Sequence, residues 1–160
     1  MAETIIVSAC LLGVKCRFDG ESKLDKKIAD IAKQYSVISV CPEVLGGLPI
    51  PRHPAEISDG DGRDVLEGNS SVVQLKNKRN VTDNYIEGAE RVIKAVKSRD
   101  IKFAIFKERS PSCGVSNIYR DGELVEGVGV ATAALMKENI KVYSEESPEI
   151  VNQQEAYDIK

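Results

Sequence analysis

Four cysteines are the residues of this chain best suited to chemistry. Cys10, Cys41 and Cys113 each lie just beyond a run that is predicted to be a buried strand, and Cys16 lies on the same loop as Cys10. Cys113 sits in the small-residue turn SPSCG at 110–114, after the run IKFAIF at 101–106. A thiol on a rigid turn beyond a strand is predicted to be presented to a bound group.

Helical and strand periodicities alternate along the chain and indicate how these cysteines are positioned. Ser22 and Thr82 are predicted N-caps of two of the helices. The alternation predicts an α/β fold, a three-layer Rossmann-like arrangement with a mostly parallel central sheet. The predicted strands are 4–9, 36–40, 72–75, 101–106 and 140–144, the helices are 23–35, 83–98 and 127–139, and a hairpin is expected at 118–125.

A parallel sheet would bring the cysteine loops together. The carboxyl ends of parallel strands meet at one edge, which is where open α/β sheets place their ligands. We therefore expect Cys10, Cys41 and Cys113 to converge although they are far apart in the sequence. The alternative is that each cysteine is only a small buried hydrophobe. The segment 44–71 is too long for a plain connection, so we expect either a functional excursion or a flap.

The cysteine spacing limits what the thiols can hold. Paired C-x2-C knuckles and the closely spaced ferredoxin run are both missing, which argues against a zinc ribbon and a ferredoxin site. The single histidine, His53, excludes a histidine-rich catalytic metal site. Converging soft thiolates favour an iron–sulfur cluster, with zinc as the second choice, and spacing alone does not choose between them.

An acid and two hydroxyls lie beside the thiols. Glu43 follows Cys41 by two residues and could relay protons, or it could pair with an arginine for structural reasons. Ser110 and Ser112 flank Cys113, although serines in turns usually hydrogen-bond the backbone. The residues alone leave both interpretations of Glu43 and Ser110 open, and Ser112 is a candidate substrate contact.

Two arginines are expected in the same loops. Arg17 and Arg52 could each donate a forked pair of hydrogen bonds to a carboxylate, phosphate or carbonyl group. Alternatively, they could hold Asp19 or Glu56 in structural ion pairs. We predict Arg17 and Arg52 to be substrate-binding residues.

Size and charge narrow the class of protein. The 160 residues suit one domain, predicted over 1–144, followed by a polar tail at 145–160 that we expect to pack loosely. The net charge of −3 argues against nucleic acid or a membrane surface as a partner. No run approaches the roughly 20 apolar residues of a membrane span, and the N-terminus does not read as a signal peptide. A cytoplasmic location, where thiols stay reduced, is therefore expected.

Three longer motifs carry a family resemblance. SACLLGVKCRFDG at 8–20, CPEVLGGLPIPRHPAEI at 41–57 and KERSPSCG at 107–114 resemble the thiouracil desulfidase family over about residues 4–144. The resemblance implies a 4Fe-4S cluster held by three cysteines, with one iron left open for the sulfur of a thiolated base. It also implies that the sulfur of a base such as 2-thiouracil leaves as hydrogen sulfide and that uracil remains.

Carried onto this sequence, the resemblance assigns the site residues. It makes Cys10, Cys41 and Cys113 the cluster ligands and places Cys16 near the cluster but not on it. Glu43 would move the proton of an attacking water, and Ser110 would help to place water or substrate. Because no net electron transfer is needed, hydrolysis is the expected reaction, and a small thiolated base is the expected partner.

Other functions stay open on the sequence. A structural or sensory metal-binding domain would use Cys16 in a closed four-thiolate site without a pocket. The same chemistry could act on thionucleotides or on a thiobase derived from transfer RNA. A thiol redox protein would need a disulfide such as Cys10–Cys16, although the C-x-x-C motif is absent.

Overall fold

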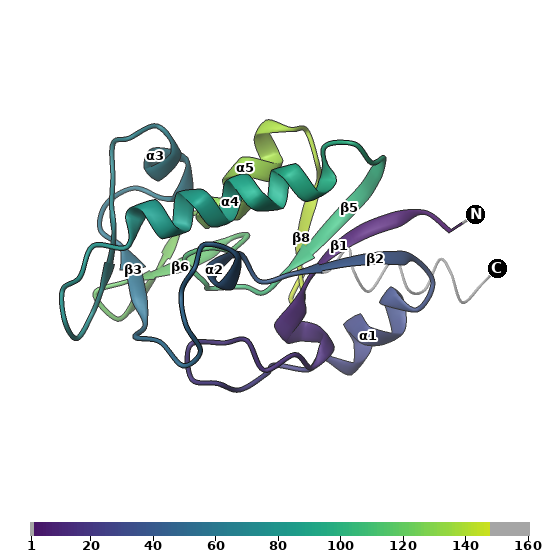
Figure 1. Ribbon diagram of the computed structural model, residues 1–160, viewed down its shortest axis with the longest axis horizontal. Helices are drawn as coiled ribbons and strands as arrows, with labels where there is room; N and C mark the ends of the chain where they lie inside the picture. The colour runs from purple at the N-terminus through teal and green to yellow at the C-terminus, as the bar shows by residue number, and fades with distance from the viewer. Residues whose placement is uncertain (1, 148–160) are drawn as a thin grey trace.

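A four-stranded sheet forms the centre of the protein. The structure is a computed structural model that describes residues 2–147. The strand order is β2-β1-β5-β8, and every pairing in this sheet is parallel. The fold is therefore the predicted α/β arrangement with helices on both faces of the sheet (Figure 1). The strands are β1 (Thr4–Ser8), β2 (Ser36–Val40), β5 (Ile101–Phe106) and β8 (Val142–Ser144).

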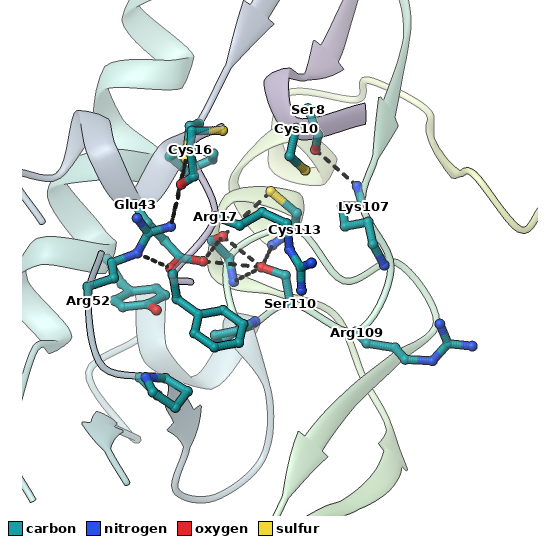
Figure 2. Close-up of a pocket in the computed structure, with 18 of the residues that line it drawn as sticks. Ser8, Cys10, Cys16, Arg17, Glu43, Arg52, Lys107, Arg109, Ser110 and Cys113 are labelled. Carbon is teal, nitrogen blue, oxygen red and sulfur yellow. Dashed lines mark hydrogen bonds and ion pairs between the residues drawn. The ribbon is translucent and has the colours of Figure 1, made fainter. Parts of the chain in front are cut away.

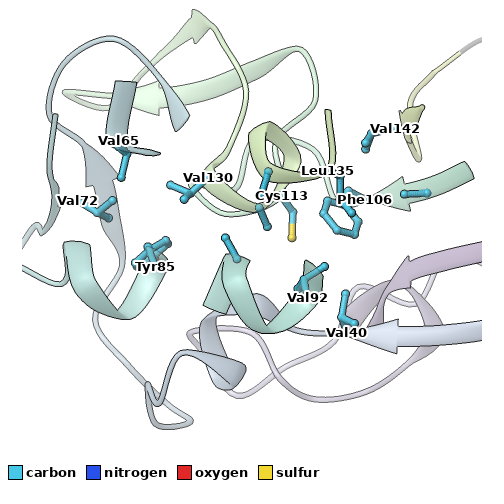
Figure 3. Close-up of a cluster of buried hydrophobic side chains, with 14 of the residues drawn as sticks. Val40, Val65, Val72, Tyr85, Val92, Phe106, Cys113, Val130, Leu135 and Val142 are labelled. Carbon is cyan, nitrogen blue, oxygen red and sulfur yellow. The ribbon is translucent and has the colours of Figure 1, made fainter. Parts of the chain in front are cut away.

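Alternate side chains of the central strands enter two different cores. Ile5 and Val7 of β1 pack with Ile28 and Ile31 of α1 (Lys26–Ala32) on one face. Ile6 packs on the opposite face, in the cluster formed with α4 (Thr82–Val96) and α5 (Val130–Lys137). Figure 3 shows part of that second cluster, in which Cys113 lies among the other buried side chains. Burial on both faces explains why β1 is a continuous apolar run.

The chain order places a cleft between β1 and β5. β1 connects through α1 to β2 on one side of the sheet, whereas β5 lies on the other side of β1. The loops after β1 and β5 thus leave neighbouring strands and turn in opposite directions. Such a switch point is where open α/β sheets form ligand crevices. Cys10 and Cys113 lie on these two loops.

Small elements surround the carboxyl edge of the sheet. The expected excursion at 44–71 is ordered, and its β3 pairs antiparallel with β4. The predicted hairpin is present as β6 and β7. None of the helices in residues 2–147 is both long and apolar enough to cross a membrane. The small elements are η1 (Ala9–Leu12), α2 (Pro42–Leu45), β3 (Ala55–Ile57), α3 (Gly62–Leu66), β4 (Val72–Gln74), β6 (Asn117–Arg120) and β7 (Glu123–Glu126).

Both predicted helix caps were wrong. Helix α1 begins at Lys26, and the Asp25 side chain accepts a hydrogen bond from the Ile28 amide at 3.2 Å. Ser22 does not cap it because the backbone of Lys23 and Asp25 is hydrogen-bonded to the η1 turn. Thr82 is the first residue of α4 rather than its cap, and its hydroxyl accepts a hydrogen bond from the β4 amide of Val72 at 2.9 Å.

The start of the expected tail contacts the domain. Glu145 pairs with Lys107 at 2.9 Å and accepts the Glu108 amide at 2.8 Å. Glu146 pairs with Arg109 through both carboxylate oxygens. These contacts attach residues 145 and 146 to the segment that follows β5. The rest of the expected tail, 148–160, lies outside the described residues.

Candidate active site at the carboxyl edge of the sheet

A cavity of about 550 Å³ opens at the carboxyl edge, and all four cysteines line it. Figure 2 shows Cys10, Cys16 and Cys113 there. Cys10, Cys16 and Cys113 are buried, Cys41 is half-buried, and all four are free thiols. The expected convergence of Cys10, Cys41 and Cys113 is therefore present. The other predicted site residues line the same cavity: Arg17, Glu43, Arg52, Ser110 and Ser112.

The turn that carries Cys113 is held by the start of α5. The amide of Val130 donates to the Pro111 carbonyl at 2.9 Å, and the amide of Ala131 donates to the Ser112 carbonyl at 2.8 Å. The Thr132 hydroxyl donates to the Cys113 carbonyl at 3.0 Å. The first amides of a helix lack partners within it, so the turn satisfies them. These hydrogen bonds fix the backbone on both sides of Cys113.

A glycine contact positions Cys41 and Glu43. Cys41 is the N-cap of α2, and Pro42 and Glu43 form its first turn. A Cβ atom on Gly46, the C-cap of α2, would lie 1.9 Å from the Asn84 carbonyl oxygen, and one on Gly88 of α4 would lie 2.0 Å from the Pro42 carbonyl oxygen. Neither position can hold a side chain without moving a backbone. The two helices therefore touch backbone to backbone, and α4 sets the position of α2.

The carboxylate of Glu43 lies at the centre of a hydrogen-bond network. Its Oε1 accepts from Nε of Arg52 at 2.9 Å. Its Oε2 accepts from the hydroxyl of Ser112 at 2.8 Å and lies 3.3 Å from the hydroxyl of Ser110. The Ser112 hydroxyl also lies 3.5 Å from Sγ of Cys113. The Ser112 hydroxyl thus links the Glu43 carboxylate to Cys113, a predicted ligand.

Ser110 has a second, structural role. Its hydroxyl oxygen accepts the amides of Ser112 and Cys113, both at 3.1 Å. It also lies 2.9 Å from the Ser112 hydroxyl. Ser110 therefore holds the turn closed, as serines in turns usually do. Ser112, which is buried, makes the shorter contact with Glu43.

The thiols strongly affect one another. Burial raises the pKa of the Cys113 thiol to about 12. The neighbouring Cys16 thiol, and then burial, raise the pKa of Cys41, and a hydrogen bond with Cys10 raises that of Cys16. Cys16 is thus a close neighbour of two predicted ligands, Cys10 and Cys41. Bound metal ions would favour the thiolate forms, with release of protons.

Comparisons with known proteins identify the family of the chain. A family model described as 2-thiouracil desulfurase matches residues 5–147. The chain belongs to this family. The uncharacterized protein YbbK of Bacillus subtilis (strain 168) is 39% identical over 144 residues, covering 88% of this chain and 95% of that protein. A solved structure of the [4Fe-4S]-dependent thiouracil desulfidase TudS matches with a TM-score of 0.80 and 36% identity, covering 99% of each chain. The family resemblance stated from the three motifs is thereby confirmed.

In this member of the 2-thiouracil desulfurase family, the cavity is also lined by residues that the sequence did not single out. Tyr85 of α4 is buried and lines the cavity. Burial, and then the Glu43 carboxylate, raise the pKa of Tyr85 well above its ordinary value. Tyr85 lies four residues before Ala89, so extending the apolar stripe of α4 by one turn would have found it. Ser8 and Glu108 also line the cavity, at the ends of the two central strands.

The four thiols line one cavity. Within residues 2–147, no three His, Cys, Asp or Glu side chains converge closely enough to hold a single metal ion. The only histidine, His53, is exposed and does not line the cavity. Soft thiolates suit an iron–sulfur cluster, and the solved structure that this member of the 2-thiouracil desulfurase family resembles is that of a [4Fe-4S]-dependent protein.

The rim of the cavity is basic and aromatic. Arg17 and Lys23 line it beside Phe18 and Tyr119, whose side chains are exposed. Arg17 lies 3.8 Å from Asp19, and its guanidinium stacks over the Phe18 ring at 5.5 Å from the ring centroid. Of the two predicted substrate-binding arginines, Arg17 is the more exposed, with 22% of its side-chain surface exposed. Arg52 is buried against Glu43.

Proposed function

We propose that this protein removes sulfur hydrolytically from thiolated pyrimidines such as 2-thiouracil, using a [4Fe-4S] cluster held by Cys10, Cys41 and Cys113. The observation that carries the proposal is the meeting of four thiols and the Glu43–Ser112 pair around one cavity. Family membership and the likeness to TudS support the same reaction. When bound, the cluster supplies a soft Lewis-acidic iron that prefers a thione sulfur to a carbonyl oxygen.

The protein's own groups supply the proton transfers. The reaction adds one water to the thiocarbonyl carbon, breaks the C–S bond and forms a C=O bond, so uracil and hydrogen sulfide are the products. No electrons enter or leave. Oε2 of Glu43 is the acceptor for a proton of the attacking water, because Arg52 occupies Oε1. The hydroxyls of Ser110 and Ser112 orient that oxygen and the water.

The cavity also argues against a purely structural metal site. A closed four-thiolate centre would leave no room for a substrate, whereas this cavity has a volume of about 550 Å³. It is open beside exposed aromatic side chains that can stack on a planar ring. An enzyme with a small planar substrate is therefore the function that the geometry supports best.

The test is anaerobic reconstitution with iron and sulfide, followed by incubation with 2-thiouracil in water labelled with oxygen-18. The proposal predicts equal amounts of hydrogen sulfide and uracil, with the label in the uracil carbonyl. An iron-loaded protein that releases no hydrogen sulfide would refute the desulfidase function. Release of hydrogen sulfide with unlabelled uracil would refute the hydrolytic mechanism but not the desulfidase function.

Thionucleotides are a second candidate substrate class, favoured by the basic rim. Lys23 lines the cavity, and it makes no ion pair within the described residues. With Arg17 it could contact a phosphate group. If thionucleotides are the substrate, Lys23→Gln raises KM for a thiouridine monophosphate and leaves KM for the free base unchanged. Equal effects on both substrates would exclude the phosphate contact.

A further inference from the structure

The charged side chain of Arg52 is buried in the site and hydrogen-bonds the protein through every guanidinium nitrogen. Only 3% of its side-chain surface is exposed. Nε donates to Oε1 of Glu43 at 2.9 Å, and one terminal nitrogen donates to the carbonyl of Cys16 at 2.9 Å. The other terminal nitrogen donates to the Pro49 carbonyl at 3.2 Å. All three nitrogens of the guanidinium are therefore bound to the protein itself, and Figure 2 shows the contacts with Glu43 and Cys16.

The contacts of Arg52 join two parts of the site. Its backbone amide donates to the Phe18 carbonyl at 2.8 Å, while its side chain binds the Cys16 carbonyl. Arg52 thus makes two hydrogen bonds to the 16–18 segment, one from its backbone and one from its side chain. The same side chain holds one oxygen of Glu43 and leaves the other facing Ser112. The acid and the wall that carries Phe18 are fixed relative to each other through this one residue.

We propose that Arg52 is a positioning residue, which orients Glu43 and clamps the 16–18 wall without contacting the substrate. The inference rests on the proposed function, because it assigns Arg52 a part in that reaction. It replaces the substrate-binding role expected from the sequence. An arginine suits the task because its planar fork donates in several fixed directions, whereas a lysine is a single point charge.

A double-mutant cycle on the iron-loaded enzyme separates positioning from substrate contact. The variants are Arg52→Ala, Glu43→Gln and the double variant. We expect Arg52→Ala to lower kcat by about 10–100-fold, as is typical for residues behind a catalytic group. Because the 16–18 wall also loosens, the dissociation constant of the product uracil should rise, but by a smaller factor than kcat falls. Because both residues act as one unit, the double variant should be no slower than Glu43→Gln alone.

Two further variants guard against a trivial loss of folding. Arg52→Lys keeps the charge but loses the fork, so it should fold and load iron while kcat stays low. Guanidinium ions added to Arg52→Ala should restore part of kcat, which a globally damaged protein would not allow. The matched control is Arg91→Ala, which breaks an exposed arginine–glutamate pair on α4 and should change neither kcat nor uracil binding.

Two outcomes would overturn the inference. Weaker uracil binding by Arg52→Ala with an unchanged kcat would make Arg52 a substrate-binding residue. If the fold-losses in kcat of the two single variants multiply in the double variant, Arg52 does not act through Glu43. Hydrogen exchange at residues 16–18 tests the clamp separately, since exchange should speed up in Arg52→Ala, and unchanged exchange would refute the clamp. Failure of the wild type to release hydrogen sulfide would instead refute the proposed function, and with it the catalytic part of this inference.

Discussion

The two oxygens of Glu43 have different partners, and this division defines the acid–base chemistry of the site. Oε1 is bound by Arg52, whereas Oε2 faces the serine hydroxyls. A glutamine at this position keeps the size of the side chain but cannot accept a proton from water. We expect Glu43→Gln to bind iron as the wild type does and to lose about 10²–10⁴-fold in kcat. Steady-state hydrogen sulfide release and iron content measure this, with Glu90→Gln on the exposed side of α4 as the control. Loss of iron together with activity would contradict the assigned role.

Ser110 and Ser112 should differ when each is replaced by alanine. Ser110 accepts two backbone amides, and leaving a buried amide without a partner costs about 1–3 kcal/mol. Ser110→Ala should therefore loosen the turn and lower iron retention at Cys113. Ser112→Ala removes a hydroxyl from Glu43 without freeing an amide, so it should retain iron and lose turnover. Iron content under a chelator, measured beside kcat, distinguishes them, and the reverse order of effects would refute this division of roles.

Glu108 makes stability depend on pH. It is buried, and its Oε1 accepts the amides of Val115, Ser116 and Asn117 at 2.7, 2.8 and 3.1 Å. Burial opposes the charged form, but these hydrogen bonds outweigh it and hold the pKa of Glu108 below its ordinary value. The carboxylate therefore stabilises the fold above its unfolded pKa of about 4.3, and this contribution is lost as pH falls through the lower folded value.

The pH prediction is tested by urea unfolding of the wild type and Glu108→Gln, both prepared without iron. The wild type should have the higher free energy of unfolding at pH 7. The difference should shrink as pH falls below about 4.3, because only the wild type gains the proton on unfolding. A difference that stays constant between pH 7 and pH 3 would show that the charge of Glu108 contributes nothing.

At the scale of elements, the contact between α2 and α4 transmits position to the site. Gly88 lies inside α4, where alanine would normally favour the helix by about 1 kcal/mol. Its Cβ, however, would lie 2.0 Å from the Pro42 carbonyl oxygen, so α2 must move and carry Cys41 and Glu43 with it. We expect Gly88→Ala to lower both iron binding and the melting temperature. The control Glu90→Ala, on the exposed side of α4, should lower neither. A more stable Gly88→Ala protein that binds iron normally would refute this contact.

The elements that sequence could predict were those with a strong period. The central strands and α4 follow from apolar runs and a 3.6-residue stripe. The starts of two helices were predicted wrongly. Ser22 and Thr82 are residue types that often cap helices, but contacts with residues far away in the sequence decide what each of them does here. Helix α3 was missed because its Asp61–Asp64 capping box lies within a glycine-rich segment that resembles a loop.

At the scale of the whole molecule, the parallel sheet explains why distant cysteines meet. The sequence predicted that loops after parallel strands share one edge, and the structure places Cys10, Cys41 and Cys113 there. The strand order was not predictable, because local periodicity does not say which strands are neighbours. For the same reason the sequence could not show that Arg52 is turned inward to Glu43, nor that Tyr85 reaches the cavity.

We propose that Cys10, Cys41 and Cys113 hold a cluster and that Cys16 does not. The most direct measurement is the iron and acid-labile sulfide content of the four single Cys→Ser variants after the same anaerobic reconstitution. We expect Cys10→Ser, Cys41→Ser and Cys113→Ser to lose most of their iron and Cys16→Ser to keep the wild-type amount. Iron loss in Cys16→Ser, with full retention in any of the other three, would show that Cys16 is a ligand in place of that cysteine.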